Sequence, residues 1–391
     1  MEQRKQSAFL MAVLAAGIVL AVGGYFYTYR HDQRLTEWKW NLPAHFPLPR
    51  VPADNRMSEE KFQLGRNLFY DKRLSGNGTF ACASCHFQKL AFTDGKAFAT
   101  GSTGEHTLRS AQGLANSAYH AYFTWANYSL PSMERQMLVP MIGENPVEMG
   151  INDNTKPIVL QRLQSDESYV KQFKLVFAGE DQPINLNNIV KAISAFQRGL
   201  ISANSKYDQY LLHKTTLSDS EERGRALFFS DQAQCSQCHG SFNFNDQVIT
   251  ADTQDVKTPY HNTGLYNLDG KGAFPDNNAG IFLQSNRPED MGMFRAPSLR
   301  NVALTAPYMH DGSIVTLKEV LDFYAGHGRL ITQGPNKGDG RKSPLKDKRI
   351  DKIKLSAQDK EDLIAFLKTL TDEEFVTNPR FSDPFKKAAV Q

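Results

Sequence analysis

The sequence has little net charge and no long block of charges of one sign. Its 45 lysines and arginines nearly balance its 42 aspartates and glutamates, so the formal net charge is +3 over 391 residues. A strongly basic balance is the usual mark of a nucleic-acid-binding surface, and charge therefore gives no case for nucleic acid as a partner. The apolar content of 40% and charged content of 22% do not favour disorder and suit a globular body of two modules.

Cysteine is scarce as well, with four residues in the whole chain. All four fall in two copies of one pattern, CASCH at 82–86 and CSQCH at 235–239. Two disulfides, a redox dithiol or a zinc site are the alternative uses of these cysteines. The repeated C-x-x-C-H favours haem c, because two thiols on one turn can add to the haem vinyl groups while the adjacent imidazole binds the iron. The predicted attachment and proximal-ligand residues are Cys82, Cys85, His86, Cys235, Cys238 and His239.

The first 30 residues differ from the rest in composition. Arg4 and Lys5 precede residues 7–29, which carry no charged side chain and are long enough to cross a bilayer as a helix. We predict a signal anchor over 1–30 in the inner membrane, with the rest of the chain in the periplasm. Secretion after cleavage is the alternative, although residues 21–30 offer only a weak small-x-small cleavage site.

An extended linker is expected over 31–56, because its prolines remove backbone donors and bias the preceding residues away from helix. It is expected to lie as a strap over the folded body. Beyond it, the string G-R-x-L-F occurs at 65–69 and again at 224–228, each time shortly before a haem motif. The residues expected on the packing faces of these two helices are Leu64, Leu68, Phe69, Ala226, Leu227 and Phe228.

Two further segments, 187–201 and 356–370, are predicted to be the helices that close the two modules. The second opens with a Ser-x-x-Asp capping box. The predicted fold is mostly α, with two cytochrome c-like domains that each carry a covalent haem c. The domains span 57–205 and 206–391, and the boundary lies between about 202 and 222.

Several ordered strings carry a family resemblance over nearly the whole exported part. They are AFTDG after the first haem motif, NPVEMG between the motifs, and RAPSLRNVALTAPYMHDG after the second. The chain resembles the bacterial dihaem cytochrome c peroxidase and MauG superfamily. It looks most similar to the MbnH-type dihaem enzymes, which the strings WKWNLPAHFPLPRVPADN and FTWANYSL indicate.

Tyr324 lies fourteen positions after His310 of the P-Y-x-H-x-G string. By residue type alone it suits core packing on an amphipathic helix. The resemblance implies instead that Tyr324 is the distal ligand of the second haem, where peroxidases of the family carry methionine, and that His310 lies near this haem without ligating it. A phenolate stabilises ferric and higher states of iron, whereas a thioether favours ferrous iron, so the tyrosine implies a low potential.

For the first haem the resemblance implies a distal pocket of Gln136, Pro140 and Glu148. Glu148 is expected to be the general acid-base and Gln136 its hydrogen-bonding partner. The stretch from Pro140 to Glu148 is two residues longer than in MauG. Trp125 is expected to lie between the haems and relay a hole. Without the resemblance, these residues suit helix-surface polarity, a loop acid and aromatic core filling.

The resemblance also implies a calcium ion between the modules. Its expected protein ligands are the side chain of Asn116 and the carbonyls of Thr305 and Pro307, with water completing the sphere. His106 is a rival ligand for the first haem, because some peroxidases carry a removable distal histidine in this loop. Its register favours a solvated loop histidine.

These residues together predict a peroxide-dependent dihaem oxidase of the MauG and MbnH type. Hydrogen peroxide would react at the His86 haem, and the oxidising equivalents would reach an aromatic residue of a periplasmic partner. By resemblance that residue is a tryptophan and the partner is associated with copper handling. One alternative is a cytochrome c peroxidase fed by a small redox protein, and another is a non-enzymatic electron carrier.

Overall fold

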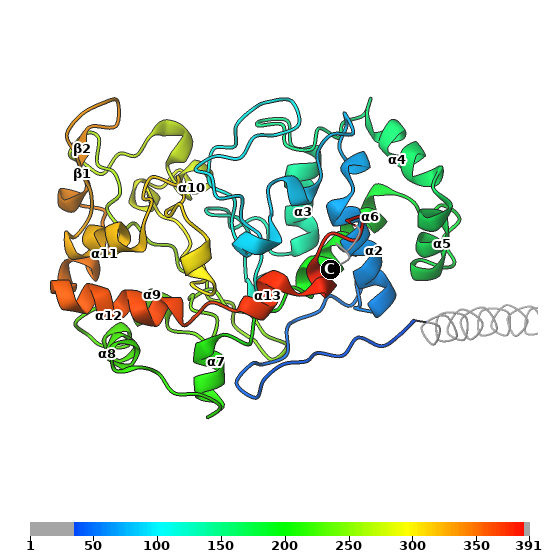
Figure 1. The fold of residues 1–391 in the computed structure, drawn as a ribbon. Helices are drawn as coiled ribbons and strands as arrows, with labels where there is room; N and C mark the ends of the chain where they lie inside the picture. The colour runs from blue at the N-terminus through cyan, green and yellow to red at the C-terminus, as the bar shows by residue number, and fades with distance from the viewer. Residues whose placement is uncertain (1–34, 387–391) are drawn as a thin grey trace, which may run out of the picture.

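The computed structural model describes residues 35–386, and these form a mostly helical body (Figure 1). Its one sheet within that range is a short antiparallel hairpin of β1 (Leu330–Ile331) and β2 (Gly338–Asp339). The predicted signal anchor at 1–30 lies outside the described residues. Within 35–386, none of the helices has the length and apolar character needed to cross a membrane.

The first module is built on α2 (Glu59–Tyr70) and α6 (Leu186–Arg198), the predicted closing helix. The faces of both helices are apolar, and α2 buries Leu64, Leu68 and Phe69 as predicted. Gly65 allows the two helices to cross closely, because a Cβ at this position would lie 1.9 Å from the carbonyl oxygen of Ala192. The G-R-x-L-F string thus supplies the glycine that this crossing requires.

The second module repeats this crossing with α8 (Asp219–Phe228) and α12 (Ala357–Lys368). A Cβ on Gly224 would lie 1.9 Å from the carbonyl oxygen of Asp362. The predicted capping box at the start of α12 is confirmed. The expected packing face was wrong at Ala226, which is exposed, because Gly224 and Phe228 lie one turn apart and form the buried face.

Shorter helices and long irregular segments complete the two modules (Figure 1). The remaining α-helices in the described part of the chain are α3 (Met133–Ile142), α4 (Lys156–Gln164), α5 (Glu167–Val176), α7 (Lys206–Leu211), α9 (Ser236–His239), α10 (Phe282–Ser285), α11 (Leu317–Ala325) and α13 (Glu373–Thr377).

Residues 36–58 form the predicted extended strap, and the strap contacts both modules. Near its start, Trp38 packs against Phe62 of α2 with ring centroids 4.9 Å apart. Further along, the amide of Ala251 donates a 2.8 Å hydrogen bond to the carbonyl of Leu48. The strap therefore ties the module that contains the first haem motif to the one that contains the second.

A buried ion pair fixes the segment that joins the modules. Asp208 of α7 is fully buried and accepts hydrogen bonds from Arg300 at 2.9 and 3.0 Å. The strap contributes a further partner, because Nε2 of His45 lies 2.9 Å from the same carboxylate. This cluster joins the strap, the connecting helix and the second module, so the relative position of the two haem motifs is firmly held.

The C-terminal segment returns to the first module. Phe375 and Phe381 are buried in the same apolar core as α2, and the hydroxyl of Tyr70 donates to the carbonyl of Phe381 at 2.7 Å. The domain boundary between residues 205 and 206 stays a prediction for most of each module. The last part of the range 206–391, however, packs with the first module, because its aromatic side chains complete that core.

Candidate functional site

The first haem motif borders a cavity of about 290 Å³, called here the first cavity. Cys82, Cys85 and His86 form one wall. The His86 ring is oriented by its Nδ1–H, which donates to the carbonyl of Phe92 at 2.6 Å. Burial lowers the pKa of His86, so the ring is neutral and its Nε2 lone pair is available to a metal.

The second haem motif borders the second cavity, of about 250 Å³. Its wall includes Cys235, Cys238 and His239. As in the first cavity, Nδ1–H of the histidine donates to a backbone carbonyl, that of Phe244 at 2.9 Å. Burial also lowers the pKa of His239. Both motifs therefore present a neutral imidazole whose ring is oriented by a backbone carbonyl, as a haem ligand requires.

Tyr324 lies on α11 and lines the second cavity together with His239. Thr316 and Glu319 cap the helix, and Phe323 points into the apolar core. The Tyr324 hydroxyl makes no hydrogen bond with any residue of 35–386, and burial raises its pKa. Tyr324 is half-buried, so its unpartnered hydroxyl is free to bind a group that enters the cavity. This environment suits a phenol that binds a metal.

Gln136, Pro140 and Glu148 line the first cavity with His86. Gln136 and Pro140 lie one turn apart on α3 and share a face, while Met137 and Met141 are buried in the apolar core and also border this cavity. Glu148 comes from the following loop, and its carboxyl makes no hydrogen bond within the described residues. Burial raises the pKa of Glu148, so this carboxyl is suited to hold and release a proton.

Trp125 lies where the two cavities meet and lines both. Its indole Nε1–H donates to the carbonyl of Ser110 at 2.9 Å, and its own carbonyl accepts from the amide of Arg295 at 2.9 Å. The ring is therefore held in one orientation between the haem motifs. This is the position expected for an intermediate electron carrier.

A buried arginine, Arg295, and a half-buried one, Arg109, flank this junction without an acidic hydrogen-bond partner in 35–386. Arg295 is 3% exposed, and burial lowers its pKa to about 10. It donates to Gln112 and to the carbonyl of Tyr122, but its Nε has no partner. Arg109 lines the first cavity and bonds only the amide oxygen of Asn278, at 3.0 Å.

Such guanidinium groups call for an anion. Gln112 and His120 line both cavities, and each has a buried side-chain nitrogen without a partner. A carboxylate-bearing group that enters both cavities would satisfy them, and the propionates of haem have that chemistry. The residues present therefore fit two haems. These four positions were not predicted from the sequence. The first arginine of the RAPSLRN string, Arg295, is the signal that could have indicated one of them.

Asn116 and Asn301 occupy equivalent places in the two modules. Both have positive φ, 57° and 61°, and both begin a 3₁₀ turn. The Asn116 amide donates to the carbonyl of Ser202 at 2.8 Å and accepts from its N–H at 2.7 Å. The Asn301 amide accepts from the N–H of Asp372 at 2.8 Å and donates to the Ser202 hydroxyl at 3.0 Å. Each asparagine therefore anchors its loop to the segment that follows a closing helix.

The predicted calcium ligands fit only in part. The carbonyls of Thr305 and Pro307 accept no hydrogen bond from the described residues, and both residues line the second cavity. Asn116 lines neither cavity, and its amide oxygen is already bonded. Ser110 lines the same cavity as Thr305 and Pro307, and its hydroxyl donates to the carbonyl of Met309 at 3.2 Å. Calcium stays a prediction, and Asn116 is poorly placed for it.

Two histidines named from the sequence lie in contrasting places. His106 is exposed, its Nδ1 is 3.2 Å from the hydroxyl of Thr100, and it lines neither cavity. His310 is buried in the second cavity and stacks on Phe294 with ring centroids 3.6 Å apart. Burial lowers the pKa of His310 to about 3, so this ring is neutral.

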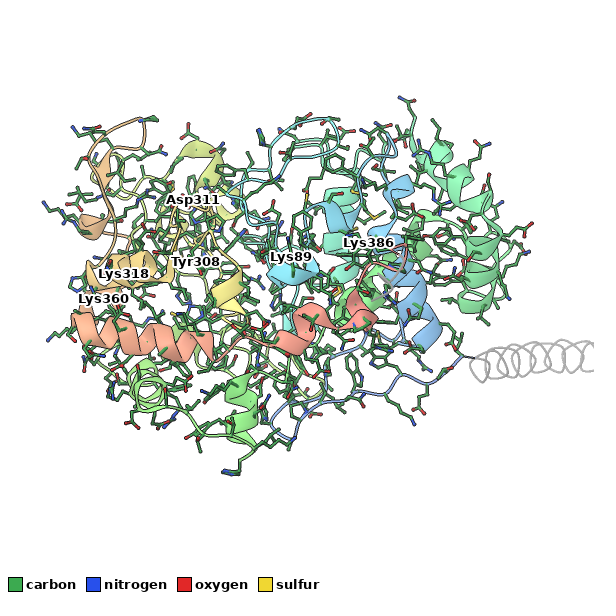
Figure 2. All side chains as sticks on the ribbon, in the orientation of Figure 1. Lys89, Tyr308, Asp311, Lys318, Lys360 and Lys386 are labelled. Carbon is green, nitrogen blue, oxygen red and sulfur yellow. The ribbon has the colours of Figure 1, made fainter. Side chains whose placement is uncertain are left out.

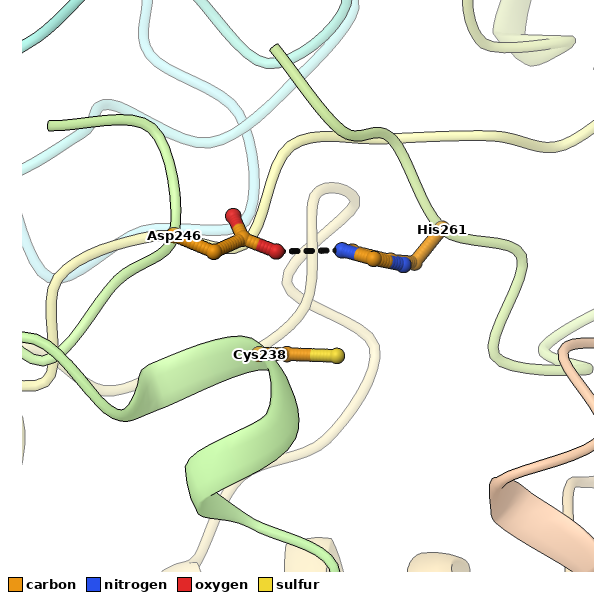
Figure 3. Close-up of side chains that lie close together, drawn as sticks. All are labelled: Cys238, Asp246 and His261. Atoms are coloured by element: carbon orange, nitrogen blue, oxygen red, sulfur yellow. Dashed lines mark hydrogen bonds and ion pairs between the residues drawn. The ribbon is translucent and has the colours of Figure 1, made fainter. Parts of the chain in front are cut away.

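A third histidine, His261, forms a cluster with Cys238 and Asp246 beside the second haem motif (Figure 3). Its Nε2 lies 2.6 Å from Asp246 and its Nδ1 3.3 Å from Asp347. Burial alone would lower the pKa of His261, but the bonds to Asp246 and Asp347 raise it to about 11. The three groups have the spacing of metal ligands, yet a thioether at Cys238 removes the thiolate that such a site would need.

Comparison with known proteins assigns the family. The family model for di-haem cytochrome c peroxidase matches residues 59–216. Cytochrome-c peroxidase IdrP1 of Pseudomonas sp. is 35% identical over 85% of this chain and 88% of its own length. The methylamine utilization protein MauG of Methylorubrum extorquens is 30% identical over 88% of this chain and 86% of its own.

The chain belongs to the di-haem cytochrome c peroxidase and MauG family. It is therefore an oxidoreductase of a family that uses two haems. A solved structure described as a MauG-like protein associated with microbial copper homeostasis is similar along its entire length. It covers 89% of this chain with a TM-score of 0.88 and 54% identity.

Proposed function

We propose that this chain is a peroxide-dependent dihaem c-type oxidase of the MauG kind that oxidises an aromatic residue, expected to be tryptophan, on a partner protein. The observation that carries the proposal is the difference between the two cavities. Beside His86, the first cavity is lined by Gln136, Pro140 and Glu148, which are not usual iron ligands, and its three methionines are buried in the apolar core. The second cavity instead holds the phenol of Tyr324, which has no other partner in the described chain.

Each haem would be held by its own motif and by the junction between the cavities. Cys82 and Cys85 would attach the first haem and Cys235 and Cys238 the second, with His86 and His239 as proximal ligands. Arg109 and Arg295 supply positive charge for the propionates. When bound, the two haems supply iron centres that take up oxidising equivalents from peroxide.

In the first cavity, Glu148 is placed to move a proton. A carboxyl with a raised pKa can move a proton from one peroxide oxygen to the other, and a bound haem would supply the two electrons that let the O–O bond break with loss of water. The Gln136 amide can orient the peroxide by hydrogen bonding, and Pro140 excludes a competing ligand from the same face. Each of these side chains lines the cavity and none is tied up in another contact.

In the second cavity, Tyr324 would ligate as the phenolate. Its hard, anionic oxygen would favour higher oxidation states of a bound haem iron over the ferrous state and so ease the loss of an electron from that group. Trp125 lies between the cavities and can pass that electron in a short step. These two residues would allow both oxidising equivalents to be shared and delivered one at a time.

The partner is proposed from similarity. The MauG-like protein with 54% identity is associated with copper homeostasis, which supports a copper-associated protein as the substrate. The predicted anchor at 1–30 places both proteins in the periplasm, with this chain either held at the inner membrane or released after cleavage. A calcium ion between the modules is retained as part of the proposal, with the carbonyls of Thr305 and Pro307 as its ligands.

A cytochrome c peroxidase is the second candidate, because relatives of 35% and 33% identity carry that name. Steady-state turnover separates the two. The oxidase should consume peroxide slowly with a reduced small cytochrome as donor, and a Tyr324→Met variant should do so faster because a thioether raises the haem potential. Fast turnover by the wild type, unchanged by the substitution, would favour the peroxidase. No reaction with peroxide at all would favour a simple electron carrier.

A further inference from the structure

The positive charge of this chain is concentrated in one segment. Residues 333–355 contain eight lysines and arginines but three acidic residues, a net charge of +5, whereas the whole chain carries +3. The rest of the chain is therefore slightly acidic. The near-neutral total conceals a local field that can act on a charged partner.

The inner side of this segment forms part of the wall of the second cavity. Asp347, Arg349, Ile350 and Ile353 line that cavity together with Tyr324. In Figure 1 the segment runs from the β1–β2 hairpin to the start of α12, at the end of the molecule farthest from α4 and α5. The charge therefore lies around the second haem motif and far from the first module's outer helices.

Hydrogen bonds and an ion pair hold the backbone of residues 333–355 in place. Lys346 is 7% exposed, and its ammonium donates to the carbonyls of His327 and Arg341 at 2.8 and 2.6 Å. It also forms a 2.6 Å ion pair with Asp351. Arg349 reaches the carbonyl of Gln237, inside the second haem motif, at 3.3 Å. The outer side chains are therefore displayed from a fixed backbone next to the haem-attachment turn.

Most of the basic side chains that residues 333–355 expose form no ion pair with an acidic residue. Lys337, Lys348, Lys352 and Lys354 are exposed and form no ion pair with any residue of 35–386. Nearby, Arg341 and Lys342 share the single carboxylate of Asp339. On the adjoining helices, Lys318 and Lys360 share Asp322 in the same way, and Figure 2 shows both lysines at this end. Unpaired cations at a fixed surface attract an acidic surface over about a Debye length, near 8 Å at physiological salt.

We propose that this face, residues 333–355, docks an acidic protein partner against the outer wall of the second cavity. The inference rests on the proposed function, since a partner that exchanges electrons must approach one of the two haems closely. A protein suits the face better than a lipid surface, because the lysines alternate with the buried Ile350 and Ile353 and do not form an apolar or amphipathic helix.

The test uses the full-length holoprotein and two redox proteins of opposite charge. The dithionite-reduced holoprotein passes one electron to an oxidised acidic plastocyanin, or to a basic mitochondrial cytochrome c, and stopped flow measures the rate. The plastocyanin rate should fall about tenfold between 10 and 200 mM salt, and the cytochrome rate should stay flat or rise.

Charge reversal locates the effect. Lys348→Glu, Lys352→Glu and Lys354→Glu together should slow plastocyanin about tenfold at low salt. The matched control of Lys171→Glu, Lys174→Glu and Lys214→Glu changes the total charge equally at exposed positions outside residues 333–355 and should have little effect. Equal slowing by both variants would overturn the inference, as would binding to anionic phosphatidylglycerol vesicles without any effect on plastocyanin. Because no peroxide is present, failure of the proposed oxidase chemistry would leave this result unchanged.

Discussion

Replacing Asp208 by asparagine should destabilise the joint between the two modules more than any surface substitution. The carboxylate accepts two hydrogen bonds from Arg300 and one from His45, and the side chains of both Asp208 and Arg300 are 1% exposed. The variant leaves the arginine charge buried without its anion, which typically costs about 3–5 kcal/mol. Arg300 keeps its bonds to the carbonyl of Phe242, so we expect the lower end, about 3 kcal/mol.

Urea unfolding of the holoprotein, followed by Soret circular dichroism, measures this change. The control is Asp153→Asn, because Asp153 is fully exposed and lies 3.4 Å from Lys156. An exposed pair contributes about 0–1 kcal/mol, so the control should be nearly neutral. A loss of less than about 1 kcal/mol for Asp208→Asn would refute the view that this pair holds the joint.

The pH dependence of stability gives a second readout for Asp208. Burial by itself would raise the pKa of Asp208, but the charge and hydrogen bonds of Arg300 lower it below its ordinary value. Such a carboxyl contributes stability that is complete above its unfolded-state pKa of about 4 and is lost as the pH falls through its folded-state pKa. The wild-type and Asp208→Asn stability curves should lie apart at neutral pH and converge under acid. Parallel curves down to the lowest accessible pH would contradict this account.

Three further outcomes test other parts of the structure. Glu148→Gln should slow the reaction with peroxide about 100-fold in stopped flow, whereas Glu144→Gln in the same loop should not. Gly224→Ala should lower the unfolding free energy by about 1–3 kcal/mol in urea, because its methyl group meets the backbone of α12, and Ala226→Ser should change it little. Asn116→Ala should destabilise by about 1–3 kcal/mol equally with added calcium or with chelator; a loss seen only with calcium would restore Asn116 as a ligand.

Local patterns predicted the parts of the molecule that depend on neighbouring residues. The two C-x-x-C-H strings, the G-R-x-L-F helices and the capping box of α12 each lie within a few turns of chain, and their geometry follows from residue type and spacing. Ala226 was misplaced because the four-residue spacing from Gly224 to Phe228, and not the apolar run itself, defines the buried face.

Contacts between distant segments were beyond the reach of these patterns. Arg295 meets Gln112 across 183 positions, and His261 meets Asp347 across 86. The positively charged site around Arg295, between the two cavities, forms only when the chain folds. The same is true of the contacts of His261 with Asp246 and Asp347. Asn116 shows the same limit. It is structurally equivalent to Asn301, because each accepts a hydrogen bond from a residue that follows a closing helix, Ser202 and Asp372 respectively. This equivalence cannot be read from the sequence alone.

The central claim is that the two haems differ in their distal coordination, with Tyr324 on the second and no protein ligand on the first. EPR of the ferric holoprotein, compared with Tyr324→His and Tyr324→Met, tests it most directly. The account predicts one high-spin and one low-spin signal, with only the low-spin signal altered by either substitution. Two low-spin haems in the wild type, or a low-spin signal that neither substitution changes, would contradict it.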